Sequence, residues 1–352
     1  MFQPSKTTLA LLEDIERRID PETEEDYARQ WEDFLYDRFD GDIFMPQRKK
    51  RTPSSVPLPT INVNDTLEDY DLMLQSELIM LSNALNSPSR TAGVWVGGYG
   101  TGTLSSILGA EIFVVPRELN TLPTTKPLGS NDRIREAIER GVPDLDTGLG
   151  KRAFEFGEIL AEVFSKYPKI SKYAKVYHPE LQGPLDIAEL LWGPDMFYAM
   201  YDEPELVHAL LSLITETFTA CMHRWQKIFP CTSDINSYKF YHYRGTLLLR
   251  CDSAMNLSPA LYKEFVSPYD SLLYSRFGGG AMHFCGKGDH YIEVLSETPG
   301  LTAINLTQPQ YNDMETIYRN TVDKGIKILA LDRRQALRDK DRIGGFKGCV
   351  SS

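Results

Sequence analysis

Cysteine is scarce in this chain: only five occur among its 352 residues. A small, odd number of cysteines in a chain of this length argues against a disulfide framework and favours a reducing compartment. The thiols are therefore expected to be free or to act as metal ligands. They are Cys221, Cys231, Cys251, Cys285 and Cys349.

Long apolar runs and an excess of basic charge are also missing. No run of about 18 apolar residues occurs, which predicts no transmembrane helix, and the charged N-terminal region is unlike a signal peptide. The formal net charge of −11 argues against nucleic acid as the main partner, because phosphate binding needs a basic surface. Serine hydrolase chemistry has little support, because the chain has no G-x-S-x-G elbow. We therefore expect a cytoplasmic protein that binds a small molecule, and neither nucleic acid nor a membrane.

Strand-like and helix-like segments alternate along most of the chain, which predicts an α/β fold with parallel strands covered by helices. Amphipathic helical segments are expected before the first strand, at 5–40 and 66–87. The glycine-rich segment Gly97–Gly102 has neither the dinucleotide nor the Walker spacing, which disfavours a doubly wound nucleotide-binding sheet. Strands are expected at 93–96, 111–115, 177–182, 247–252, 281–285, 302–306 and 326–331, and helices at 150–166, 186–200, 204–226, 259–277, 288–297 and 311–324.

The sharpest motif is His283-Phe284-Cys285 at the end of a predicted strand, with glycines on both sides. Residues i and i+2 of a strand face the same side, so the imidazole and the thiol point together. Such a pair provides two of the three protein ligands of a catalytic zinc site, and Cys349 is a candidate for the third. Buried histidine and free cysteine are also common in cores, so the spacing alone leaves a structural role open.

Other polar residues lie near the ends of predicted strands, where barrel enzymes carry their catalytic groups. Asp252 ends an apolar strand, although a helix cap or a salt bridge would explain it equally well. Arg333 could pair with a substrate carboxylate or lie on the surface. The full set comprises the candidate catalytic residues Asp252, Tyr99 and His242 and the candidate substrate-binding residues Gln182, Asn305, Gln308 and Arg333.

Several stretches, in order between about residues 93 and 331, resemble the uroporphyrinogen decarboxylase superfamily. The resemblance implies a single (β/α)8 TIM barrel over 91–352, with a cleft at the carboxyl ends of its strands. Residues 1–90 would be a helical extension packed on that barrel, and a homodimer would be typical. The stretches are Gln182–Gly193, Tyr201–Glu205, Leu213–Glu216, Asp252–Pro259, Phe265–Tyr269 and His283–Gly286.

That superfamily has two chemistries. One branch decarboxylates the acetate arms of a cyclic tetrapyrrole without a metal. The other transfers a methyl group between a corrinoid and a thiol such as coenzyme M, with a zinc ion held by a His-x-Cys pair and a distant cysteine. The chain lacks the N-terminal Arg-Gln-Ala-Gly-Arg-Tyr-like segment of the decarboxylases, and it has no histidine after His290.

The methyltransferase branch therefore fits better, with His283 and Cys285 at the positions of its ligand pair. Cys349 would be the third zinc ligand, although it lies closer to the pair in sequence than that branch's third cysteine does. The leading hypothesis is zinc-dependent methyl transfer between a corrinoid, or a methylated small molecule, and a thiol, with a corrinoid protein as an allowed partner. The alternatives are decarboxylation of a tetrapyrrole or other polycarboxylate, and a non-catalytic barrel that binds a corrinoid or another small ligand.

Overall fold

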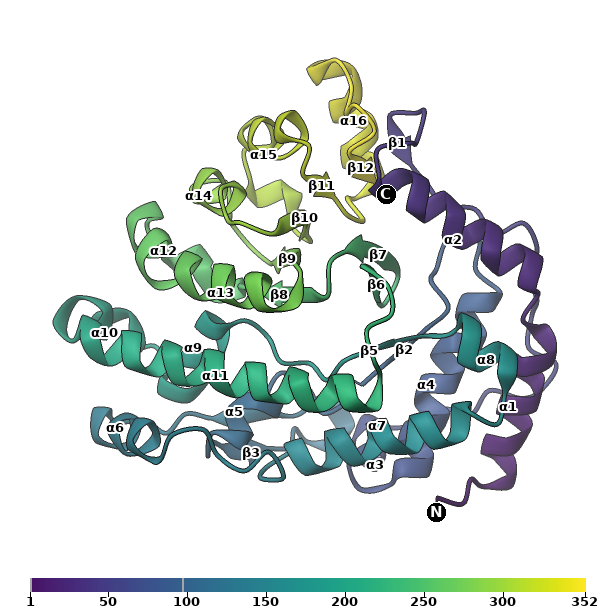
Figure 1. Ribbon diagram of the computed structural model, residues 1–352, viewed down its shortest axis with the longest axis horizontal. Helices are drawn as coiled ribbons and strands as arrows, with labels where there is room; N and C mark the ends of the chain where they lie inside the picture. The colour runs from purple at the N-terminus through teal and green to yellow at the C-terminus, as the bar shows by residue number, and fades with distance from the viewer. Residues whose placement is uncertain (1, 97) are drawn as a thin grey trace.

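The computed structural model describes residues 2–96 and 98–352, so Gly97 of the predicted glycine-rich segment lies outside the described residues. Figure 1 shows helices arranged around a curved array of short strands. The main sheet is parallel throughout, and in it the first strand of the chain pairs directly with the last. Its strands, in spatial order, are β1 (Ile43–Phe44), β12 (Val350–Ser351), β11 (Lys327–Ile328), β10 (Leu301–Leu306), β9 (Gly280–Phe284) and β8 (Leu247–Arg250).

The remaining strands form three separate pairs. β2 (Gly93–Trp95) and β5 (Lys175–Tyr177) pair in parallel, whereas β6 (Ile235–Tyr238) and β7 (Tyr241–Arg244) form an antiparallel hairpin. That hairpin contacts β2 and β5 on one side and β9 and β10 on the other. β3 (Glu111–Phe113) and β4 (Thr124–Lys126) form a second antiparallel hairpin.

The structure thus confirms a mixed α/β fold with a mostly parallel central sheet, but it does not show the expected closed (β/α)8 barrel. Among the described strands, no ladder joins β8 or β1 to the β2–β5 pair. One expected barrel strand is missing, because the segment at 111–115 pairs with β4 in an antiparallel hairpin.

The first helices of the chain precede β2. Ser5, Asp20 and Asp69 cap the starts of α1, α2 and α4, because each side chain accepts a backbone N–H of the first turn. The single helix expected over 5–40 is broken at Asp20-Pro21, where a new cap and a helix-starting proline stand together. These helices are α1 (Lys6–Arg18), α2 (Pro21–Leu35), α3 (Val63–Glu68) and α4 (Tyr70–Leu85).

The later helices cover the outside of the strands. Gly193, with φ of 82°, divides the helix expected over 186–200, and Val266 divides the one expected over 259–277. The helices are α5 (Thr103–Ile107), α6 (Asn131–Arg140), α7 (Gly150–Phe164), α8 (Pro168–Tyr173), α9 (Pro184–Trp192), α10 (Met196–Asp202), α11 (Pro204–Ile228), α12 (Pro259–Phe265), α13 (Ser267–Phe277), α14 (Ile292–Ser296), α15 (Met314–Asn320) and α16 (Arg333–Ile343).

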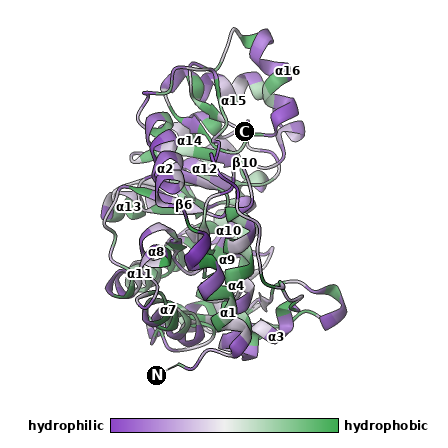
Figure 2. Cartoon of the chain, turned by 90° about the vertical axis from the view of Figure 1, so that its right-hand side faces the viewer, coloured by the Kyte–Doolittle hydropathy of each residue, from purple (hydrophilic) through white to green (hydrophobic). Residues whose placement is uncertain are grey.

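Helix α11 is long and apolar enough to cross a membrane, with a mean hydropathy of 1.2 over its most apolar window. However, 67% of that window is buried inside the protein, as expected for a core helix. Apolar and polar residues are interspersed along α7 and α11, which therefore carry both green and purple segments in Figure 2. This pattern is typical of helices with one buried face.

The inner face of the main sheet is covered by aromatic side chains of α2. Trp31 and Phe34 pack with Phe44 in one buried cluster, which also contains the small residues Ala281 of β9 and Ala303 of β10. The N-terminal helix α2 therefore packs against the inner face of the main sheet. Since β1 also lies within residues 1–90 and pairs with β12, this segment is an integral part of the sheet.

Candidate metal site at the ends of β8, β9 and β10

The register of three neighbouring strands gathers polar side chains on one face. Arg250 of β8 and Asn305 of β10 are both register partners of His283 on β9. Because side chains on the same face recur every second residue, Asp252, Cys285 and Thr307 follow two residues later, just past the ends of the same three strands. The sequence thus builds two adjacent rows of polar groups at the carboxyl ends of the strands.

Two residues of the second row, Cys285 and Asp252, lie close to the His283 ring. The thiol Sγ of Cys285 lies 3.5 Å from His283 Nε2, and Oδ1 of Asp252 lies 3.7 Å from the same nitrogen. One ligand atom from each of these three residues lies within 4.8 Å of the other two. The backbone N–H of Cys285 donates to Asp252 Oδ1 at 2.7 Å, which holds the carboxylate beside the pair.

Asn305 determines which nitrogen of His283 is free. The amide nitrogen Nδ2 of Asn305 donates to the carbonyl of Leu329 at 2.7 Å, so its oxygen Oδ1 must face the imidazole. That oxygen lies 2.6 Å from His283 Nδ1, which therefore carries the proton and donates it. Consequently Nε2 presents its lone pair toward Cys285 and Asp252, as a metal-ligating histidine does.

The three donors fit a zinc ion by type and by spacing. Zinc takes imidazole, thiolate and carboxylate ligands, and catalytic sites use three protein ligands with one open position. Tetrahedral bonding at the usual lengths would put an imidazole nitrogen and a thiolate about 3.6 Å apart and a nitrogen and a carboxylate oxygen about 3.3 Å apart. The observed separations of 3.5 Å and 3.7 Å are close to both.

The protonation states also depend on burial. Burial lowers the pKa of His283, with the nearby Arg250 charge acting in the same direction, so the imidazole is neutral and able to bind a metal. Burial, assisted by Asp252, raises the pKa of the Cys285 thiol. A cation at this site would reverse that effect, because it stabilises the thiolate. Thr307 Oγ1, 3.1 Å from Cys285 Sγ, supplies a hydroxyl beside the sulfur.

A buried carboxylate, that of Asp186, holds the loop that carries Asp252. The carboxylate of Asp186, on α9, accepts the backbone N–H groups of Asp252 at 3.1 Å and Ser253 at 2.9 Å. Burial, followed by repulsion from Asp252, raises the pKa of Asp186 to about 6. On the other side of the motif, Gln308 Oε1 accepts the backbone N–H of Gly286 at 2.6 Å.

Arg250 lies beside this cluster, but its charge is already paired. Its Nε lies 3.2 Å from Glu180 Oε1, and it also donates to the hydroxyl of Tyr238. The guanidinium is therefore held by protein groups and does not stand open as a carboxylate clamp.

Several predicted site residues lie elsewhere. Tyr99 is buried, and burial raises the pKa of its hydroxyl, although the nearby Arg152 of α7 opposes this shift. His242 is buried on β7, where its Nδ1 lies 2.7 Å from Ser237 Oγ and its ring contacts Trp31. The first residue of α16, Arg333, is exposed.

Cys349, the predicted third ligand, lies away from the His283–Cys285 pair. It precedes β12, three strands from β9 in the sheet, which is about 14 Å at the usual strand spacing. Its thiol is buried 3.9 Å from Lys327 Nζ, near where the strands begin, whereas Cys285 follows the end of its strand. The structure therefore brings Asp252, and not Cys349, to the His283–Cys285 pair.

Gln182 does lie near the cluster. It is buried, with φ of 59°, and the next residue, Gly183, sits directly against the carbonyl of Arg250. Sequence reasoning missed Thr307, although the two-residue periodicity of β10 could have placed it on the face that carries Asn305.

Comparison with known proteins shows the fold alone. No family model and no curated protein matches the chain. Among solved structures, the chain is similar to a methyltransferase from Methanosarcina mazei, with a TM-score of 0.60 and 13% sequence identity over 92% of this chain and 91% of that chain. Our chain therefore shares the overall architecture of a protein described as a methyltransferase.

Proposed function

We propose that this protein is a zinc-dependent enzyme that transfers a methyl group to a small thiol, and that Asp252, His283 and Cys285 hold the metal. The observation that carries the proposal is the convergence of these three donors, with the free Nε2 of His283 fixed by Asn305. The fold shared with a methyltransferase supports the choice of reaction. Overall, a sulfur–carbon bond would form while the bond between the methyl carbon and its donor breaks, and the donor keeps the electron pair.

Zinc, when bound, would lower the pKa of a substrate thiol in its open position, so that the thiolate exists at neutral pH. The chain's own residues prepare the site for this task. Asn305 keeps the proton on Nδ1 of His283, and the hydroxyl of Thr307 lies beside the Cys285 sulfur. The Cys285 backbone N–H and the buried Asp186 hold Asp252 in place.

A corrinoid is the methyl donor we propose to test first, because the His-x-Cys motif resembles that of corrinoid-dependent methyltransferases. Purified protein that has not been exposed to a metal-affinity resin should contain about one zinc per chain. Mixing it with methylcobalamin and 2-mercaptoethanesulfonate should demethylate the cobalamin, as followed by its visible spectrum.

Variants distinguish this proposal from adventitious zinc. His283→Ala and Cys285→Ala should each lose zinc and methyl transfer, whereas Cys231→Ser, a matched change at an exposed cysteine, should retain both. The proposal is wrong if the purified protein contains no zinc, or if the His283→Ala and Cys285→Ala double variant transfers methyl at the wild-type rate.

A further inference from the structure

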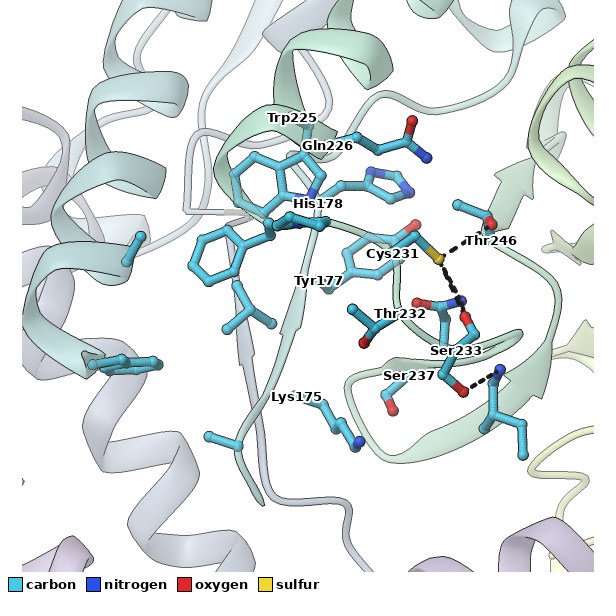
Figure 3. Close-up of a pocket in the computed structure, with 18 of the residues that line it drawn as sticks. Lys175, Tyr177, His178, Trp225, Gln226, Cys231, Thr232, Ser233, Ser237 and Thr246 are labelled. Atoms are coloured by element: carbon cyan, nitrogen blue, oxygen red, sulfur yellow. Dashed lines mark hydrogen bonds between the residues drawn. The ribbon is translucent and has the colours of Figure 1, made fainter. Parts of the chain in front are cut away.

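A second hollow in the protein lies away from the candidate metal site. A cavity of about 350 Å³ lies between the end of α7, helix α8, the start of β5, the end of α11 and the segment that leads into β6 (Figure 3). It shares no lining residue with the metal cluster. Thr246, which lines the cavity, precedes β8, whereas Asp252 follows the end of that strand. The two sites are therefore at opposite ends of β8, and the cavity is large enough for a small molecule.

The charge of the cavity differs from that of the protein. The chain has 49 acidic residues, yet none of the described residues that line this cavity is Asp or Glu. Two lysines line it. Lys172 is already paired with Glu25, at 2.9 Å. Lys175 has no ion-pair partner within the described part of the chain, and the surrounding protein lowers its pKa by desolvation. Lys175 also lines a neighbouring hollow with Glu24 and Glu25, but these carboxylates pair with Arg48 and Lys172. An ammonium group without an ion-pair partner favours an anion.

The other end of the cavity is aromatic and carries neutral hydrogen-bonding groups. Figure 3 shows Trp225, Gln226 and His178 gathered at one end and the ammonium of Lys175 toward the other. His178 is buried, and desolvation lowers its pKa to about 4, so the ring is neutral. Its Nδ1 donates to the carbonyl of Pro179 at 2.7 Å, which leaves Nε2 as an acceptor without a partner among the described residues.

We propose that this cavity binds a small aryl-alkanoate, with its ring between Tyr177 and Trp225 and its carboxylate at Lys175. The rings supply the apolar, flat surface that an aromatic group prefers. A single unpaired lysine matches one negative charge, whereas a phosphate dianion calls for more donors than the Lys175 end provides. A hydroxyl on the aromatic ring would meet the acceptor and amide groups at the His178 and Gln226 end.

The probe for this site is 3-(4-hydroxyphenyl)propionate, titrated into the full-length protein by calorimetry. We expect saturable binding, weakened about tenfold or more when the carboxylate of the probe is replaced by the neutral amide. Lys175→Gln should cause a similar loss. Lys172→Gln is the matched control and should change the affinity less than about threefold, because its ammonium is paired with Glu25 outside the cavity. Absence of saturable binding up to about 10 mM, or equal affinity in Lys175→Gln and the wild type, overturns the proposal.

Cys231 offers a readout that needs no substitution. Its thiol is exposed, lines the cavity and lies 3.1 Å from the Ser233 carbonyl. Saturating probe should slow alkylation of Cys231 several-fold, mapped by mass spectrometry, and leave the alkylation of Cys285 unchanged. Unchanged Cys231 reactivity with bound probe would place the ligand elsewhere. Because the metal cluster is not part of this site, binding should persist after zinc is removed with a chelator, whatever the outcome for methyl transfer.

Discussion

The amide oxygen of Asn305 lies 2.6 Å from Nδ1 of His283, and the amide nitrogen of the same residue donates to the carbonyl of Leu329. The bond to Leu329, just past the end of β11, orients the Asn305 amide, and the amide oxygen in turn orients the His283 ring. His283 Nε2 is therefore free and faces Cys285 and Asp252. A ligand prepared in this way needs little reorganisation when a metal binds.

Asn305→Leu should therefore weaken zinc binding without removing a ligand. We expect the zinc affinity, measured by competition with a chromogenic chelator, to fall about 10- to 100-fold, because the imidazole loses the bond that fixes its tautomer. Asn83→Leu, an exposed change on α4, is the control and should bind zinc as the wild type does. Equal affinities in Asn305→Leu and the wild type would show that Asn305 does not orient a metal ligand.

The third ligand can be tested by two substitutions with opposite expected outcomes. Asp252→Ala should reduce the zinc content of the purified protein well below one per chain, because only two protein ligands would remain. Cys349→Ser should leave the content unchanged, because this thiol lies near Lys327 on β11. The reverse result, with zinc lost from Cys349→Ser and kept in Asp252→Ala, would restore the ligand set expected from the resemblance.

The sequence predicts the strands that carry the site, and most of the predicted strand ends lie within one or two residues of the observed ends. The strand expected at 281–285 is found at Gly280–Phe284, and the one expected at 302–306 is found at Leu301–Leu306. Both are short, apolar and preceded by glycine. The segment at 111–115 has a similar apolar character but pairs with β4. Composition does not separate these outcomes, since it carries no information on which segment becomes the partner.

The sequence predicts only part of the candidate site. The i, i+2 spacing places His283 and Cys285 together without any tertiary information. The position of Asp252 beside them depends on the pairing of Arg250 with His283, and a shift of one residue would turn that carboxylate to the other face. Residue type and the family resemblance favour Cys349 as the third ligand, but the order of strands in the sheet separates it from the pair.

Asp186 provides a test of the loop that carries Asp252. In Asp186→Asn, an amide N–H₂ must face one of the two backbone N–H groups that the carboxylate now accepts, so the loop loses at least one hydrogen bond. We expect the zinc affinity to fall several-fold and the free energy of unfolding to fall by about 1–3 kcal/mol. Asp195→Asn, an exposed change just before α10, is the matched control. If Asp186→Asn keeps both the wild-type zinc affinity and stability, the carboxylate does not position Asp252.

The stability of the protein should also depend on pH through a carboxyl group that lies outside both sites. Glu77, on α4, is buried and accepts the backbone N–H of Trp95 at 2.8 Å. Burial raises its pKa to about 8, although the Trp95 bond and Lys239 oppose the shift. Between its usual pKa of 4.5 and about 8, the folded protein keeps the Glu77 proton while the unfolded chain releases it. This group therefore favours the folded state below the window, and its contribution is lost as the pH rises through it.

Glu77→Gln removes this titration and keeps an oxygen that can accept the Trp95 N–H. The free energy of unfolding of the wild type, measured by urea denaturation, should fall relative to that of the variant by up to about 1.4 kcal/mol for each pH unit within the window. Glu68→Gln, at an exposed position near the end of α3, should follow the wild-type curve. Parallel curves for the wild type and Glu77→Gln between pH 5 and about pH 8 would mean that Glu77 is ionised in the folded protein, with Lys239 as the nearby cation that compensates it.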